Sequence, residues 1–122
     1  MNKELCRKVG ETSQDNLIAK LFPPAEPFGV KIAAGQGVLA RGAVLALSGT
    51  DYVVLDSETT GKANCVLSDP VDASGESPVT AVAYRTGHLN RKALIVAEGY
   101  TMTAADEEEL RKGGILLSDM LD

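Results

Sequence analysis

Three closely spaced glycines are the first feature of this sequence that could support chemistry. Gly35, Gly37 and Gly42 lie within AAGQGVLARGAVLAL, residues 33–47, and glycine loops can cradle the phosphates of a nucleotide. A dinucleotide fingerprint needs its third glycine two positions earlier than Gly42, at the start of a helix, and the residues after Gly42 favour a strand. A P-loop would need lysine and a hydroxyl residue there. The pattern therefore predicts a β-hairpin: strand, turn, short edge strand and second strand.

The single histidine, His88, is the next candidate for chemistry. A catalytic triad needs a nucleophilic serine or cysteine beside its histidine, and a zinc site needs more ligands than His88 and the scattered Cys6 and Cys65 provide. A histidine after a glycine is typical of a solvated turn. We therefore expect that the protein is not an enzyme and that it binds no metal and no cofactor.

A basic segment surrounds this histidine. AYRTGHLNRKAL, residues 83–94, contains Arg85, Arg91 and Lys92, and we expect these three side chains to lie close together on an exposed turn between two strands. Two interpretations stay open for them. They could contact an acidic neighbour, or they could keep an otherwise acidic surface soluble.

The composition indicates one small domain with a weak core. The chain has 122 residues, 44 % of them apolar and 4 % aromatic, with no tryptophan. A chain of this length buries roughly two-thirds of its unfolded surface, and a core of valine, leucine, isoleucine and alanine lacks large aromatic anchors. Part of the stability is therefore expected from self-association.

The charge and the chain ends exclude several classes of partner. The formal charge is −5, which disfavours nucleic acid and anionic membranes because both require a basic face. No apolar run approaches the length of a membrane span, and the first ten residues contain no signal-peptide core. We expect a soluble protein made in the cytoplasm, with both cysteines as free thiols.

Short apolar runs separated by turn residues predict most of the fold. Strands are expected at residues 30–34, 42–49, 51–57, 63–69, 79–87 and 93–99, with a closing strand at 115–121. Strands about ten residues apart, without helical periodicity between them, indicate an antiparallel barrel or sandwich. The predicted class is α+β and β-rich: a compact small β-barrel with one short C-terminal helix.

That helix is predicted at residues 103–114, TAADEEELRKGG. Thr103 and Asp106 form a capping-box start, acidic residues occupy the first turns, and basic residues precede Gly113 and Gly114 at the end. The four consecutive acids, residues 106–109, point in different directions on a helix. We interpret them as partners of the helix dipole and not as a metal site.

The N-terminal residues 1–28 are expected to form an extended arm, and residues 29–122 the β domain. Residues 1–16 carry charges of both signs without periodicity, and LIAKLFPPAEPF, residues 17–28, combines large apolar side chains with three prolines. Proline disfavours a central strand and favours an extended path across a surface. The arm's apolar contact residues are predicted to be Leu17, Ile18, Leu21 and Phe22.

The order of these segments resembles one known family. DNLIA, VKIAAGQGVLARGAVL, ANCVLSDPVDAS, VTAVAYRTGHLNRKAL and ELRKGGILL follow one another across residues 15–117. In this order they resemble the small head decoration proteins of tailed bacteriophages and prophages, of the lambda decoration-protein type.

The resemblance implies a fold and a function. The fold would be of the β-tulip kind, and the protein would be a structural cement protein in the virion. Homotrimers would sit outside the expanded head, bind the major capsid protein of a tailed phage and stabilise the head. From its own residues, we predict that the arm is the capsid-binding segment. Two alternatives remain: a small β-barrel carrier or ligand-binding module, in which Lys62 would be the attachment residue, and, less favoured, an enzyme.

Overall fold

The structure is a computed structural model that describes residues 17–20 and 23–119 of the chain. Its elements, in chain order, are β2 (Ile18–Lys20), β3 (Glu26–Ile32), β4 (Gly37–Leu39), β5 (Val44–Ser48), β6 (Asp51–Val54), β7 (Ala63–Leu67), β8 (Val71–Ala73), β9 (Val79–Asn90), the 3₁₀ helix η1 (Arg91–Ala93), α1 (Ala104–Gly113) and β10 (Ile115–Ser118).

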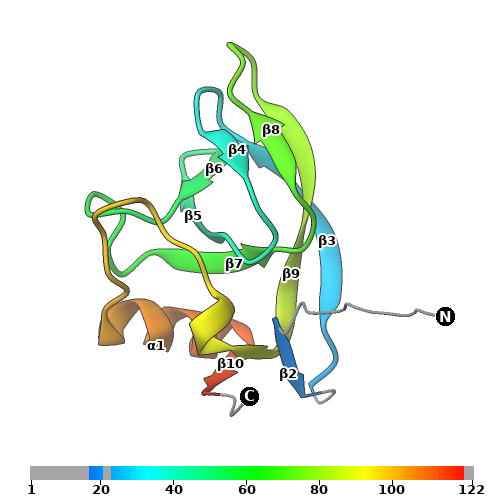
Figure 1. The fold of residues 1–122 in the computed structure, drawn as a ribbon, viewed down its shortest axis with the longest axis vertical. Coiled ribbons are helices and arrows are strands. Elements are labelled where there is room, and N and C mark those ends of the chain that lie inside the picture. The colour runs from blue at the N-terminus through cyan, green and yellow to red at the C-terminus, as the bar shows by residue number, and fades with distance from the viewer. Residues whose placement is uncertain (1–16, 21–22, 120–122) are drawn as a thin grey trace, which may run out of the picture.

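The long strand β9 organises the sheet (Figure 1). Its first part pairs antiparallel with β3, from Ile32 opposite Val79 to Glu26 opposite Thr86. From Gly87 onward it pairs in parallel with β10, and β2 pairs antiparallel near the same end. Gly87 has a φ of +149°, so glycine suits the point where β9 changes partners.

The remaining strands complete an irregular ring of pairings. β9 pairs with β3, β3 with β6, β6 with β5, β5 with β7, and β7 with β9 again. The pairing of β3 with β6 consists of Ile32 and Tyr52 alone. The fold is therefore a compact, strand-rich domain with one short C-terminal helix, as predicted, but its ring is not a clean barrel.

Two apolar cores lie on opposite sides of β5 and β7, because neighbouring residues of a strand face opposite ways. The inner core is enclosed by the ring and contains Leu45, Cys65 and Ile32. The helix-side core contains Val44, Val66 and residues from α1, β9 and β10. Aliphatic side chains dominate both cores.

The hairpin predicted around the three glycines is wrong in its pairing. β6 lies between β3 and β5, and the short strand β4 pairs with β8. Gly35 and Gly37 have φ values of +77° and +84°, so the predicted turn is present. Its backbone is held by β8 and the loop after it, through Gln36 N to Ala73 O at 2.9 Å and Gly35 N to Gly75 O at 3.1 Å.

The strand predicted at residues 93–99 is also wrong. η1 occupies its start, and only an isolated bridge joins Ala43 to Ile95. Ile95 exchanges hydrogen bonds with Gly42 and Val44, whereas Ala97 N donates to Leu55 O. Because successive hydrogen bonds go to different segments, no ladder forms.

Helix α1 begins and ends as its sequence predicts. Thr103 is the N-cap of a complete capping box with Asp106, and Gly114, at φ +109°, is the C-cap. Asp106 is fully buried. Its carboxylate accepts hydrogen bonds from Gly61 N at 2.6 Å, from Thr103 N at 2.9 Å and from the Tyr100 hydroxyl. One side chain thus joins α1 to the segment before it and to the loop after β6.

Candidate functional site

The described part of the predicted arm packs against the domain. Leu17 is 2 % exposed and belongs to the helix-side core, its carbonyl accepts a hydrogen bond from Asn90 N at 2.7 Å, and Ile18 pairs with Leu89. Leu21 and Phe22, like residues 1–16, lie outside the described residues. The side chain of Leu17 is therefore part of the domain's own packing.

The three basic residues do not form one turn, because β9 continues without a break to Asn90. Arg85 is exposed within β9, over the ring of Phe28 at 5.2 Å. Arg91 and Lys92 lie in η1. A strand advances about 3.3 Å per residue, so the residues between Arg85 and Arg91 hold their side chains apart. Their role against a partner stays a prediction.

Arg91 is already engaged by carboxylates of its own chain. Its guanidinium donates to Asp119 Oδ1 at 2.9 Å and to Glu107 Oε2 at 3.0 Å. The hydrogen bonds to Asp119 and then Glu107 raise the pKa of Arg91 above its ordinary value. Lys92 is exposed. Arg85 and Lys92 are therefore the more accessible cations of the predicted set.

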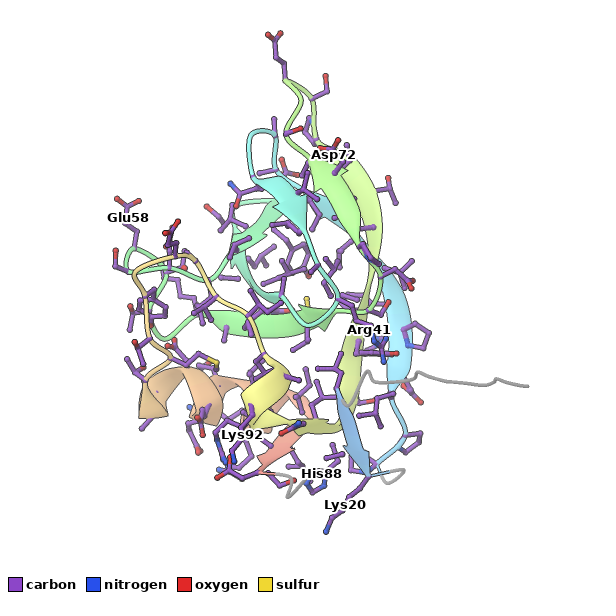
Figure 2. The ribbon with its side chains drawn as sticks, in the orientation of Figure 1. Lys20, Arg41, Glu58, Asp72, His88 and Lys92 are labelled. Carbon is purple, nitrogen blue, oxygen red and sulfur yellow. The ribbon has the colours of Figure 1, made fainter. Side chains whose placement is uncertain are left out.

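His88 lies at the lower end of the molecule in the view of Figure 2. It contributes to a groove of about 430 Å³ between α1 and β10, together with Arg91, Glu107 and Leu116. Its Nε2 atom has no hydrogen-bond partner among the described residues. No group of three or more histidine, cysteine or acidic side chains among these residues could hold a metal ion.

A second groove has a volume of about 510 Å³. It lies between β4 and residues 95–98, and Asp56 and Glu98 contribute to its wall. Two of its lining residues, Val38 and Ile95, are 76 % and 44 % exposed. Sequence analysis missed both, because GVL and ALIVA are apolar runs that indicate burial. Only the glycines around β4 signalled a short strand at the surface.

The buried thiol of Cys65 gives a direct test of the core. Cys65 is fully buried in the inner core, and burial raises the pKa of its thiol to about 12. Because the thiolate is the reactive form, a thiol reagent at pH 8 should leave Cys65 unmodified in the folded protein and modify it after unfolding. A Cys6→Ser variant isolates the signal, and rapid native modification in that variant would contradict the described packing.

The helix among the described residues is too short and too polar to cross a membrane. The described residues form a small strand-rich domain, and its two most exposed large apolar side chains, Val38 and Ile95, line one surface groove.

Comparison with known proteins gives the family. The family model "Bacteriophage lambda head decoration protein D" matches residues 28–115, and the chain belongs to this family. No curated protein matches the chain. The match runs from β3 to the first residue of β10 and therefore covers the ring of strands and α1.

Membership confirms the resemblance noted in the sequence. It makes the protein a phage head decoration protein, associated with a phage capsid and located on the virion head. The family is structural and not enzymatic. Because a decoration protein acts by binding the surface of the capsid, the exposed side chains are the candidates for capsid contact.

Proposed function

We propose that the protein binds the outside of the expanded phage head as homotrimers and stabilises the head. The observation that carries the proposal is the family match over residues 28–115. The aliphatic cores support it, because a small domain without large buried aromatic side chains benefits from burying further surface in an assembly. The exposed apolar side chains Val38 and Ile95 provide such surface.

We further propose that the N-terminal segment is the capsid-binding arm. Leu17 anchors it, since this residue is buried in the domain, and Ile18 holds the next position on β9. Contacts to the capsid would come from residues before Leu17 and from Leu21 and Phe22. Extended segments of this kind commonly add to the edge of a partner's sheet.

The basic residues are proposed to contribute less to capsid contact than the arm does. Arg85 and Lys92 would contact acidic groups on the capsid, whereas Arg91 is neutralised by Glu107 and Asp119. The carrier alternative would depend on Lys62, which is exposed beside the loop held by Asp106. The family match favours decoration over this alternative.

The trimer is tested by mass. Light scattering of the purified chain in solution should give three times its 12.8 kDa. If trimers form only on the capsid, the same mass should appear after cross-linking on heads. A mass of one chain under both conditions would contradict the trimer.

A further inference from the structure

We infer that residues 3–9 of this chain occupy the groove beside β4 in the free protein and leave it when the arm binds the capsid. This β4 groove is defined by four of its lining residues, Val38, Ile95, Asp56 and Glu98. The occupation of the groove goes beyond the proposed function, and only the release of the arm rests on that function.

The β4 groove leaves apolar side chains in contact with solvent. Val38 is the most exposed of the large apolar side chains in the described part of the chain, and Ile95 follows it. β4 pairs with β8 in a two-stranded sheet, so its other backbone edge is not paired within that sheet. Exposed apolar side chains beside such an edge favour the binding of an extended segment.

The charged side chains that line the β4 groove are both acidic. They are Asp56 and Glu98, and no described lysine or arginine lines the groove. Asp56 Oδ1 accepts hydrogen bonds from the backbone N–H groups of Glu58 and Thr59, at 3.0 and 3.1 Å, and these neutral donors leave its charge in place. Glu98 is exposed, and within residues 17–20 and 23–119 neither acid forms an ion pair. The groove therefore favours an occupant with both apolar and basic side chains.

Residues 3–9, KELCRKV, lie outside the described residues and have this chemistry. Alternate side chains of an extended segment face the same way. One face of an extended KELCRKV therefore presents two cations and two apolar groups in turn: Lys3, Leu5, Arg7 and Val9. The acidic residue of the segment, Glu4, falls on the other face. This alternation fits a groove that combines exposed apolar side chains with two carboxylates.

The described chain begins close enough to the groove for this segment to reach it. Leu17 Cδ1 lies 3.8 Å from the position that a Cβ would take at Gly42, and Gly42 O accepts a hydrogen bond from Ile95 N at 2.9 Å. Val38 is four residues from Gly42, at most about 13 Å away, whereas the eight residues from Val9 to Leu17 span up to about 26 Å. The covalent link gives the segment a roughly millimolar effective concentration, which favours it over a separate molecule of the same chemistry.

Occupation of the groove has a consequence for assembly. The arm covers Val38 and Ile95 in the free chain, where exposed apolar groups promote non-specific association. When the arm moves to the capsid, the same two side chains become available for burial in the assembly.

Trypsin cleavage tests the occupation, because trypsin cuts after Arg7 and Lys8 and a bound segment resists it. Replacing Val38 by lysine removes an apolar contact and places a cation against the segment, so Val38→Lys should speed release of the N-terminal peptide at least about tenfold. Val82→Lys is the matched control and should cleave like the wild type, because Val82 is 38 % exposed on β9, outside the groove. Mass spectrometry identifies the peptide, and circular dichroism shows whether both variants fold. Equal rates for the three proteins would contradict the inference.

A spin label shows where the segment lies and whose groove it occupies. The label is attached to Cys6, since Cys65 is buried, and it should broaden the NMR signals of Val38 and Ile95 far more than that of Leu116. Leu116 lies in β10, which Figure 1 places at the opposite end of the molecule from β4. When spin-labelled chains are mixed with isotope-labelled Cys6→Ser chains, the broadening should disappear. Broadening in the mixture would assign the segment to a neighbouring copy and overturn the inference.

The inference and the proposed function can fail separately. If the chain binds heads but shows neither protection from trypsin nor broadening at Val38, the inference is wrong and the proposed function stands. If protection and broadening are present but the chain does not bind expanded heads, the groove is occupied as inferred and the proposed function is wrong.

Discussion

Replacing Asp106 by alanine is expected to lower the free energy of unfolding by about 3–5 kcal/mol, because buried donors lose their charged acceptor. Asp106 is fully buried and accepts hydrogen bonds from Gly61, Tyr100 and Thr103. Without the carboxylate, the backbone N–H groups of Gly61 and Thr103 lose these bonds. The start of α1 and the loop after β6 would separate first. Urea unfolding followed by circular dichroism measures the loss.

Glu109→Ala is the matched control for this substitution. Glu109 lies on the same helix, is partly exposed and, among the described residues, pairs only with Lys112 at 3.3 Å. An exposed helical pair of this kind contributes about 0.3–0.5 kcal/mol, so this variant should stay close to the wild type. Equal losses for the two variants would contradict the role given to Asp106.

The pH dependence of stability should report the same carboxylate. Burial of Asp106 raises its pKa, but the hydrogen bonds from Thr103, Tyr100 and Gly61 outweigh burial and hold the pKa below its ordinary value. A lowered pKa in the folded state adds stability above the unfolded pKa of about 3.9, and this stability is lost as the pH falls through the folded pKa. The difference in stability between the wild type and Asp106→Asn should therefore shrink below about pH 4. A constant difference down to pH 2 would contradict this account.

Deleting residues 2–15 is expected to weaken capsid binding strongly and to leave the domain folded. The deletion removes the part of the proposed arm before Asn16 but spares Leu17, whose side chain is buried and whose carbonyl accepts from Asn90 N. Cosedimentation with expanded heads should then show free protein at concentrations that saturate the full chain. A truncated protein that still binds with normal affinity would contradict the arm proposal.

Leu17→Ala separates anchoring from capsid contact. Removing this buried side chain should cost about 2–5 kcal/mol of stability through the cavity it leaves. If the domain remains folded at the assay temperature, the variant should still bind heads. The deletion should weaken capsid binding and leave the fold stable, whereas Leu17→Ala should leave capsid binding and weaken the fold. These opposite outcomes distinguish an arm from a core strand.

The sequence was most informative where local rules decide the structure. The capping pair Thr103 and Asp106 and the terminal Gly114 defined α1, because helix ends depend on nearby residues. Alternation and glycine turns located most strands. The burial of Asp106 against Gly61 could not be predicted, since it brings together residues 45 positions apart.

Strand pairing was not predictable from local pattern. The glycines around Gly37 correctly indicated a turn, but the partner of β4 is β8, far along the chain. Residues 93–99 have the composition of a strand and yet alternate between two partners. The sequence predicts a turn around the basic residues, because a histidine after a glycine is typical of a solvated turn. In the structure Gly87 instead allows β9 to continue and to change neighbours.

The central claim, that this protein decorates the outside of a phage head, is tested most directly by imaging. Expanded heads of the phage that encodes the protein, prepared without it, would be incubated with the full chain and examined by cryo-electron microscopy. The account predicts saturable added density on the outer surface, in groups of three copies, and heads that withstand higher temperature. Heads that show no added density at saturating protein would contradict it.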